Sequence, residues 1–237
     1  DHRDRQRSGS FIRQIMSKIL CIETATTNCS VALFDGDTLS GLREQNDGGF
    51  SHSEKLHLFI GEVLAQAGIS PRGLDGIAVS KGPGSYTGLR IGISSAKGLA
   101  YALDIPLVSV GTLEIMAMAA MGRTDAHYLV PMLDARRMEV YTAVYDRSLA
   151  PVEAVNAKIM EADSFSSLAS SGKTACFFGD GMEKSRPLLA LANFSFLEDV
   201  FPSARFMGEK ARQAFEVGKY EDTAYFEPYY LKDFVGT

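Results

Sequence analysis

The chain has 237 residues, of which 46% are apolar and 22% are charged, and its formal net charge is −5. This composition is typical of a globular protein with a substantial core, and no apolar stretch reaches the roughly 18 residues of a membrane span. The acidic balance excludes a self-sufficient nucleic-acid binder, because affinity for phosphate backbones comes largely from lysine and arginine. The three cysteines have no metal or redox spacing, which favours a reducing, cytoplasmic setting.

Residues 1–15, DHRDRQRSGSFIRQI, predict an extension outside the fold. Met16 looks like a natural start, and an apolar strand follows at once. A transit peptide would avoid acidic residues, and two aspartates are present here. We therefore expect a disordered extension, either a cloning remnant or a translation start placed too far upstream.

The first half of the chain opens with strands and continues with alternating helices and strands. Strands are predicted at 18–24, 29–34 and 39–45, with a hairpin signal at Asp35-Gly36-Asp37. A polar loop leads to a helix over 53–67, a buried strand at 77–79, a helix over 87–103 and a strand at 105–110. A helix over 112–121 follows, with Thr112 as its expected N-cap.

The second half repeats this order. Strands 128–133 and 138–145 form a hairpin around Asp134-Ala135-Arg136-Arg137, followed by a helix near 161–170 and a strand at 175–178. Further helices are expected after Gly179-Asp180-Gly181 and from Ser203, before an aromatic-rich tail at 225–231. The sequence predicts an α/β fold of two subdomains, 16–110 and 111–237, with the boundary somewhere in 108–127. Each should hold a mixed sheet that opens with an antiparallel hairpin and is flanked by helices.

A glycine-rich turn between Val79 and the helix over 87–103 is the most informative stretch. Its glycines read G-x-G-x-x-x-G, which is neither the dinucleotide fingerprint nor a Walker A loop. A helix that begins at such a turn can hold an anion with its free N–H groups. A tight strand-to-helix connection explains the same glycines, and the sequence leaves both interpretations open.

Two helices carry more apolar faces than a surface helix needs. One face of each must cover a sheet, and the other is small and smooth, a texture that lets helices approach closely. A partner surface and a neighbouring helix of the same chain are equally good explanations. The spare faces consist of Leu58, Gly61 and Ala65 on the first helix, and Gly88, Ile91, Ser95, Gly98 and Ala102 on the second.

Candidate chemistry is otherwise sparse. No Ser/His/Asp or Cys/His set emerges, and His52 and His57 are five residues apart, so on a helix they point away from each other. Glu23 is a lone carboxylate with no base partner. The charges of Asp134, Arg136 and Arg137 are most simply solvated at a hairpin tip. The turn at 179–181 either approaches a nucleotide or, as we prefer, connects to a helix.

Four stretches together resemble the bacterial TsaB (YeaZ) family over essentially all of residues 17–232: ILCIETATTNCSVALFD, GPGSYTGLRIGISSAKGLAYAL, LDARRMEVYTAVYD and EPYYLK. The resemblance implies two actin-like (ASKHA, ribonuclease H-like) subdomains. It also implies a non-catalytic partner of TsaD, which with the ATPase TsaE forms threonylcarbamoyladenosine beside the tRNA anticodon. Family members pair through N-terminal helices, so the resemblance favours the spare faces as the site for TsaD or a homodimer. Contact with tRNA would then be only indirect, and no membrane is involved.

Departures from the TsaD pattern indicate lost chemistry. Thr27-Asn28 stands where TsaD has an acidic pair, and Thr112 and Met116 stand where it has two metal-binding histidines. A hydroxyl and a thioether are poor metal ligands, so we expect no metal and no cofactor. Weak nucleotide binding stays open at a vestigial cleft of Glu23, Thr24, Gly82, Gly84, Gly179 and Gly181.

Two other functions compete with the partner role. An ATP-dependent kinase or a carbamoyl-type transferase could use the same inter-subdomain cleft. A peptidase is excluded, since the sequence offers neither a nucleophile–base pair nor a zinc set.

Overall fold

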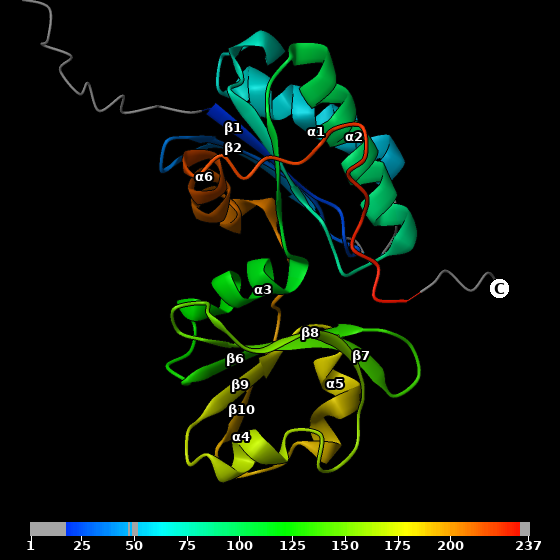
Figure 1. Cartoon of the computed structure of the whole chain (residues 1–237), viewed down its shortest axis with the longest axis vertical. Coiled ribbons are helices and arrows are strands. Elements are labelled where there is room, and N and C mark those ends of the chain that lie inside the picture. The colour runs from blue at the N-terminus through cyan, green and yellow to red at the C-terminus, as the bar shows by residue number, and fades with distance from the viewer. Residues whose placement is uncertain (1–17, 47, 49–51, 233–237) are drawn as a thin grey trace, which may run out of the picture.

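The computed structural model describes residues 18–46, 48 and 52–232. Two α/β units lie one above the other along the long axis, each built on its own five-stranded sheet (Figure 1). The predicted fold class is confirmed: both sheets are mixed and both open with antiparallel hairpins. The predicted extension over 1–15 lies outside the described residues.

The first sheet has the order β3-β2-β1-β4-β5. Its strands are β1 (Lys18–Glu23), β2 (Cys29–Asp35), β3 (Thr38–Gln45), β4 (Gly76–Ser80) and β5 (Leu107–Val110). The first three strands pair antiparallel, and β4 and β5 then add in parallel beside β1. The carboxyl ends of β1, β4 and β5 consequently meet at one edge, where open α/β sheets bind ligands.

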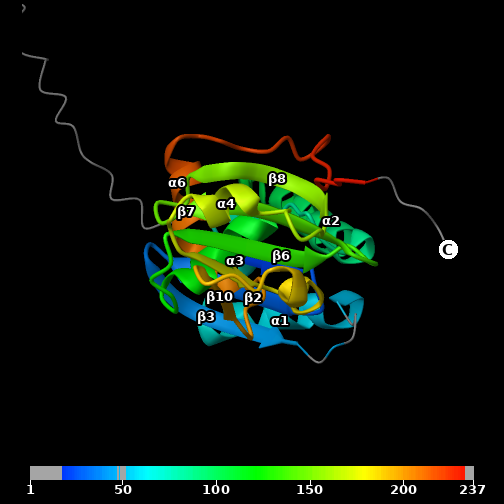
Figure 2. The same cartoon turned by 90° about the horizontal axis from the view of Figure 1, so that it is seen from below.

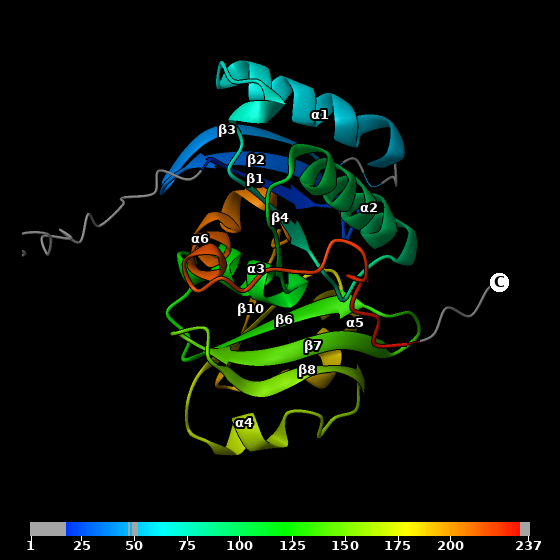
Figure 3. The same cartoon turned by 45° about the horizontal axis from the view of Figure 1, so that its top comes forward.

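Two helices cover one face of this sheet, α1 (His52–Gln66) and α2 (Tyr86–Leu103) (Figure 3). A short 3-10 turn, η1 (Pro71–Gly73), follows α1. The core faces predicted from helical spacing are confirmed, because these side chains pack against alternate residues of the strands. They include Leu56, Ile60 and Val63 of α1, and Ile93, Ala96 and Ala100 of α2.

The second sheet repeats the arrangement with the order β10-β9-β6-β7-β8. Its strands are β6 (Tyr128–Asp134), β7 (Glu139–Asp146), β8 (Pro151–Ile159), β9 (Ala175–Phe178) and β10 (Phe194–Leu197). The sequence analysis did not predict the edge strands β8 and β10. Figure 2 shows β8, β7 and β6 side by side in this sheet.

Helices lie on both faces of the second sheet. One face carries α4 (Ser166–Ser170) and α5 (Met182–Ser185), which continues into the 3-10 turn η2 (Arg186–Leu188). The helix predicted near 161–170 is thus confined to its last five residues. The other face carries α3 (Thr112–Met121), which also contributes Ile115 to the core of the first unit. The N-cap of α3 is Gly111, so the prediction of Thr112 as N-cap is wrong; Thr112 is the first helical residue.

The chain then returns to the first unit. A 3-10 turn, η3 (Ala204–Phe206), and α6 (Gly208–Glu216) cover the face of the first sheet that α1 and α2 leave free (Figure 1). Ala204, Met207 and Ala211 are fully buried there. The predicted C-terminal unit of 111–237 therefore includes a segment whose core contacts are with the N-terminal sheet. No helix in the described part of the chain is long and apolar enough to cross a membrane.

Candidate functional site

The glycine-rich turn after β4 is packed against the chain's own backbone. Gly82 has a φ of +108°, and a Cβ built on it would lie 2.6 Å from the backbone oxygen of Tyr229. A Cβ on Gly84 would lie 2.4 Å from the backbone oxygen of Ala25, which also accepts a hydrogen bond of 2.7 Å from Ser85 N–H. Glycine is required here because backbone approaches backbone.

The C-terminal segment after α6 is what covers this turn. Its Tyr229 N–H donates to Lys81 O at 2.7 Å, and the N–H of Glu221 donates to Leu107 O at 2.8 Å. Phe226 packs into the core beneath α2. The segment runs from α6 along α2 and ends beside the second unit (Figure 3). Sequence analysis noted its aromatic residues but gave no signal that it would occupy the turn.

Thr24, at the end of β1, faces the first turns of α2. Its hydroxyl donates to Gly88 O at 2.8 Å. A Cβ on Gly88 would lie 2.2 Å from Thr24 O, and a Cβ on Gly92 would lie 2.2 Å from Thr24 Oγ1. Gly88 is therefore buried against β1 and does not belong to the exposed surface predicted for it. Gly92, which sequence analysis did not single out, has the same role.

Glu23 is completely buried at the carboxyl end of β1. Its Oε1 accepts a hydrogen bond of 2.5 Å from Ala25 N–H. Burial raises the pKa of Glu23 to about 7, although the hydrogen bond from Ala25 opposes the rise. Glu23 therefore has no access to solvent in this structure.

The two glycines of the second unit are also packed by the chain itself. Gly179 has a φ of +101°, and a Cβ there would lie 2.2 Å from Met132 O. Gly181 donates its N–H to Met132 O at 3.1 Å and caps α5. The preferred interpretation, a turn leading into a helix, describes this geometry.

A cavity of about 330 Å³ is lined by both units. Its floor is apolar and includes Met116, while four carboxylate residues stand around it. Of the six residues predicted for a nucleotide cleft, only Gly179 lines this cavity. Carboxylates repel polyphosphates, so the cavity needs bound cations before it can hold a nucleotide. The four are Asp180, Glu183, Glu198 and Asp199.

The positions that depart from the TsaD pattern have internal partners or lie buried. Thr27 donates its hydroxyl to Asn46 Oδ1 at 2.8 Å, and Asn28 Nδ2 donates to Pro202 O at 3.0 Å. Thr112 and Met116 are completely buried. Within the described ranges, no group of three or more His, Cys, Asp or Glu side chains is arranged to hold a metal ion.

The two candidate histidines are separated as their spacing predicts. His52 is buried, with its Nε2 2.6 Å from Thr26 O, which corrects the expectation of a surface residue. His57 Nε2 faces the Ser95 hydroxyl of α2 at 3.4 Å.

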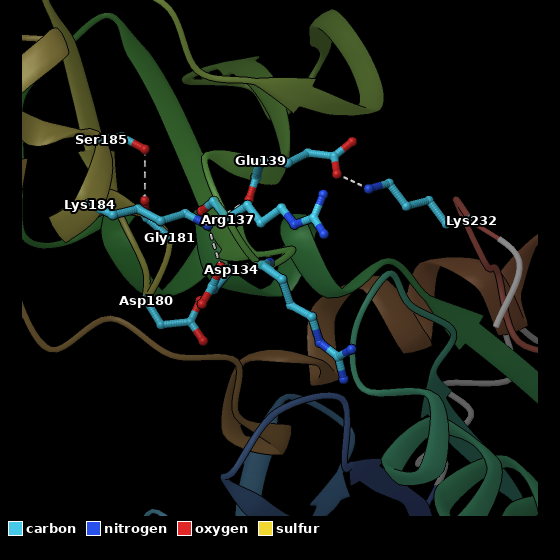
Figure 4. Close-up of polar contacts among 9 residues, drawn as sticks. Asp134, Arg137, Glu139, Asp180, Gly181, Lys184, Ser185 and Lys232 are labelled. Carbon is cyan, nitrogen blue, oxygen red and sulfur yellow. Dashed lines mark hydrogen bonds and ion pairs between the residues drawn. The ribbon is translucent and has the colours of Figure 1, made fainter. Parts of the chain in front are cut away.

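The hairpin tip between β6 and β7 is firmly anchored rather than loosely solvated. Asp134 forms an ion pair with Lys184 of α5 and accepts a hydrogen bond of 2.8 Å from Arg136 N–H (Figure 4). Lys184 also donates to Arg137 O and Glu139 O, both at 2.7 Å. The expectation of freely solvated charge thus fails for Asp134, while Arg136 and Arg137 are exposed.

The Asp134 backbone is held from a second direction. Its N–H donates to Asp180 Oδ1 at 2.8 Å, and burial raises the pKa of Asp180. These contacts tie the hairpin tip to the turn that precedes α5.

The spare faces of α1 and α2 are open to solvent. Leu58 is 58% exposed, and nothing lies within 4 Å of a Cβ built on Gly61 or Gly98. Ala65 and Ala102 are exposed, and Ile91 and Ser95 are partly buried. Gly88 is buried by Thr24, and Ser95 faces His57 of α1, but no neighbouring helix in the described part of the chain covers the five exposed residues.

Comparisons with known proteins give consistent results. The family model described as TsaD, tRNA N6-adenosine threonylcarbamoyltransferase, matches residues 48–220. TsaB of Bacillus subtilis is 32% identical over 201 residues, which cover 82% of this chain and 81% of that protein. TsaB of Escherichia coli is 38% identical over 130 residues, but the match spans only about half (55%) of each chain.

Solved structures extend the likeness to the whole fold. The structure of YeaZ from Pseudomonas aeruginosa has a TM-score of 0.78 at 25% identity and covers 91% of this chain and 100% of its own. A second structure from that organism, described as similar to peptidase YeaZ, has a TM-score of 0.79. The actin-like fold of two subdomains is thereby shown. Together with the matched family model, these likenesses establish that the chain belongs to the TsaB (YeaZ) family.

Proposed function

We propose that the chain is the non-catalytic partner of TsaD in the formation of threonylcarbamoyladenosine in tRNA. It acts in the cytoplasm, engages TsaE through the complex and forms a homodimer when isolated. The description of the matched family model and the names of the relatives support this role, since both concern the same tRNA modification. The enzymatic step belongs to TsaD.

The observation that carries the proposal is the uncovered face of α1 and α2. It combines an exposed Leu58 and exposed alanines with Gly61 and Gly98, above which an added Cβ would meet open space. Small side chains allow the helices of a partner to approach closely, and exposed apolar residues gain free energy when that partner covers them. TsaD and a second copy of the chain would compete for this one face.

Two features support a non-catalytic role over the competing kinase or transferase. The glycine-rich turn, for which the sequence left anion binding open, is packed against the backbone of Tyr229. The cavity between the units is lined by four carboxylate residues, and carboxylates repel the phosphates of a nucleotide. Neither feature supplies a nucleophile or a general base next to an open site.

The test is Gly98→Arg. The new side chain fits the monomer because the space above Gly98 is open, but at an interface it becomes a buried, unpaired charge that costs several kcal/mol. We expect size-exclusion chromatography and pull-down to show loss of homodimer and of TsaD binding, with an unchanged circular dichroism spectrum. The matched control is Gly122→Arg in the second unit, which is also an open, exposed glycine. If a folded Gly98→Arg protein still pairs, the interface lies elsewhere.

A second measurement tests the catalytic alternative. The purified chain is incubated with ATP and Mg²⁺, with and without TsaD, and phosphate release is followed. We expect no turnover by the chain alone. Turnover at catalytic rates without TsaD would establish the kinase or transferase instead.

A further inference from the structure

The hairpin tip between β6 and β7 contains two consecutive arginines in left-handed backbone conformation. Arg136 has a φ of +70° and Arg137 a φ of +51°. Glycine or asparagine fills such positions at little steric cost, whereas an arginine strains the backbone. Strain of this kind persists only where the surroundings impose it, and it concentrates at functional sites. Two consecutive strained arginines therefore indicate that their side chains have a function.

The turn is rigid because Lys184 and Asp134 hold its backbone from inside. Lys184 donates to the carbonyl oxygens of Arg137 and Glu139, and Asp134 accepts the N–H of Arg136 (Figure 4). All of these contacts use main-chain atoms of the hairpin tip, and two of them use the main chain of the arginines. Their guanidinium groups take part in none of them, so the anchoring presents the side chains outward.

The charge of the arginines is not neutralised within the chain. The two carboxylates at the hairpin tip are already paired, Asp134 with Lys184 and Glu139 with Lys232 of the C-terminal segment. Arg136 and Arg137 are exposed, and among the described residues neither side chain forms an ion pair or a hydrogen bond. The tip is thus a fixed positive point on an acidic protein of net charge −5.

We propose that Arg136 and Arg137 contact phosphate groups of the RNA that the complex modifies. This inference rests on the proposed function. It replaces the expectation that contact with tRNA is only indirect. The planar guanidinium fork matches phosphate oxygens in a bidentate way. Two such contacts on an acidic body are too few to bind RNA alone. Phosphate contacts fix the position of a nucleic acid without reading its sequence. The two arginines therefore orient an RNA that TsaD also holds.

The test uses the complex of the full chain with TsaD and a fluorescein-labelled tRNA as the probe. Anisotropy titrations between 50 and 200 mM KCl compare the parent with Arg136→Asn/Arg137→Asn. We expect about tenfold weaker binding at 200 mM salt, and a log–log salt slope smaller in magnitude by about 1 to 2. The matched control, Arg72→Gln/Lys219→Gln, removes two exposed charges elsewhere and should leave the slope unchanged.

Two further readouts separate binding from folding. Asparagine tolerates a positive φ, so the double asparagine variant should melt at or above the temperature of the parent. Arg136→Lys/Arg137→Lys keeps the charge and should restore most of the salt slope. If the hairpin and control variants have the same RNA affinity and salt slope, the proposal is wrong. It is also wrong if the hairpin variant loses TsaD binding while its RNA affinity is unchanged. That result would show that the arginines bind an acidic protein surface instead. The TsaD pull-down also reports separately on the proposed function.

Discussion

The backbone oxygen of Tyr229 lies 2.6 Å from the point where a Cβ of residue 82 would begin. The pair joins two parts of the chain separated by more than half its length, and Tyr229 N–H bonds to the neighbouring Lys81 O. The glycine-rich turn therefore packs against the C-terminal segment. Glycine serves here to admit a peptide group rather than a ligand.

Replacing Gly82 tests this relationship. Gly82→Ala forces a Cβ against a backbone oxygen at a φ that L-residues rarely adopt, and should lower the free energy of unfolding by at least about 2 kcal/mol. Urea denaturation measures the loss, and limited proteolysis should cut the C-terminal segment faster. Gly98→Ala is the control: it lies in open space within α2 and should raise stability by about 0.5–1 kcal/mol. Equal effects of the two alanines would contradict the packing described here.

The contact of Thr24 with α2 predicts that a second substitution can restore stability lost by the first. Gly92→Ala places a methyl group 2.2 Å from Thr24 Oγ1 and should cost about 1–3 kcal/mol. Thr24→Ala removes that oxygen, so the double variant should regain part of the loss. Gly88→Ala clashes with the backbone oxygen of Thr24, and the same second change should not rescue it. A double-mutant cycle based on thermal melts measures the coupling between Thr24 and each glycine. If Thr24→Ala rescued both glycine variants, the contacts described here for Gly88 and Gly92 would be wrong.

The buried Glu23 should make stability depend on pH. Because the pKa of Glu23 is raised to about 7 in the folded protein, the folded state retains a proton that the unfolded state loses near its ordinary value of 4.5. The stability contribution is thus largest at low pH and falls as pH rises towards 7, by up to about 3 kcal/mol. Glu23→Gln removes this fall.

The measurement is urea denaturation of Glu23→Gln and the parent from pH 5 to pH 8. The stability advantage of the variant should grow from pH 5 to about 7 and level off above that. Glu54→Gln, at the exposed start of α1, controls for the change in net charge. A constant difference between Glu23→Gln and the parent would show that Glu23 does not titrate in this range.

Local patterns predicted most of the fold, and contacts between distant segments account for what they missed. Strands such as 175–178 and the core face of α2 follow from apolar runs and helical spacing, which depend only on neighbouring residues. The edge strand β8 has no clean alternation because it is partly exposed on both faces, so its sequence carries little signal.

The candidate site was harder to predict for a related reason. The glycines of the turn were recognised, but their neighbour, Tyr229, comes from a segment without periodicity. Helical spacing alone assigned Gly88 to the exposed face, although Thr24, which directly follows β1, buries it. The strain at Arg136 and Arg137 lies in the backbone conformation, which these residue types do not indicate in the sequence.

The return of the chain to its first sheet has a consequence for the order of biosynthesis. Residues 18–110 are translated before residues 204–211, yet one face of their sheet is covered by Ala204, Met207 and Ala211. Domains that emerge early usually fold as units during synthesis, and exposed apolar surface on such intermediates promotes aggregation. Here Ile19, Cys21 and Val108 of the first sheet lack this cover until residues 204–211 have been translated.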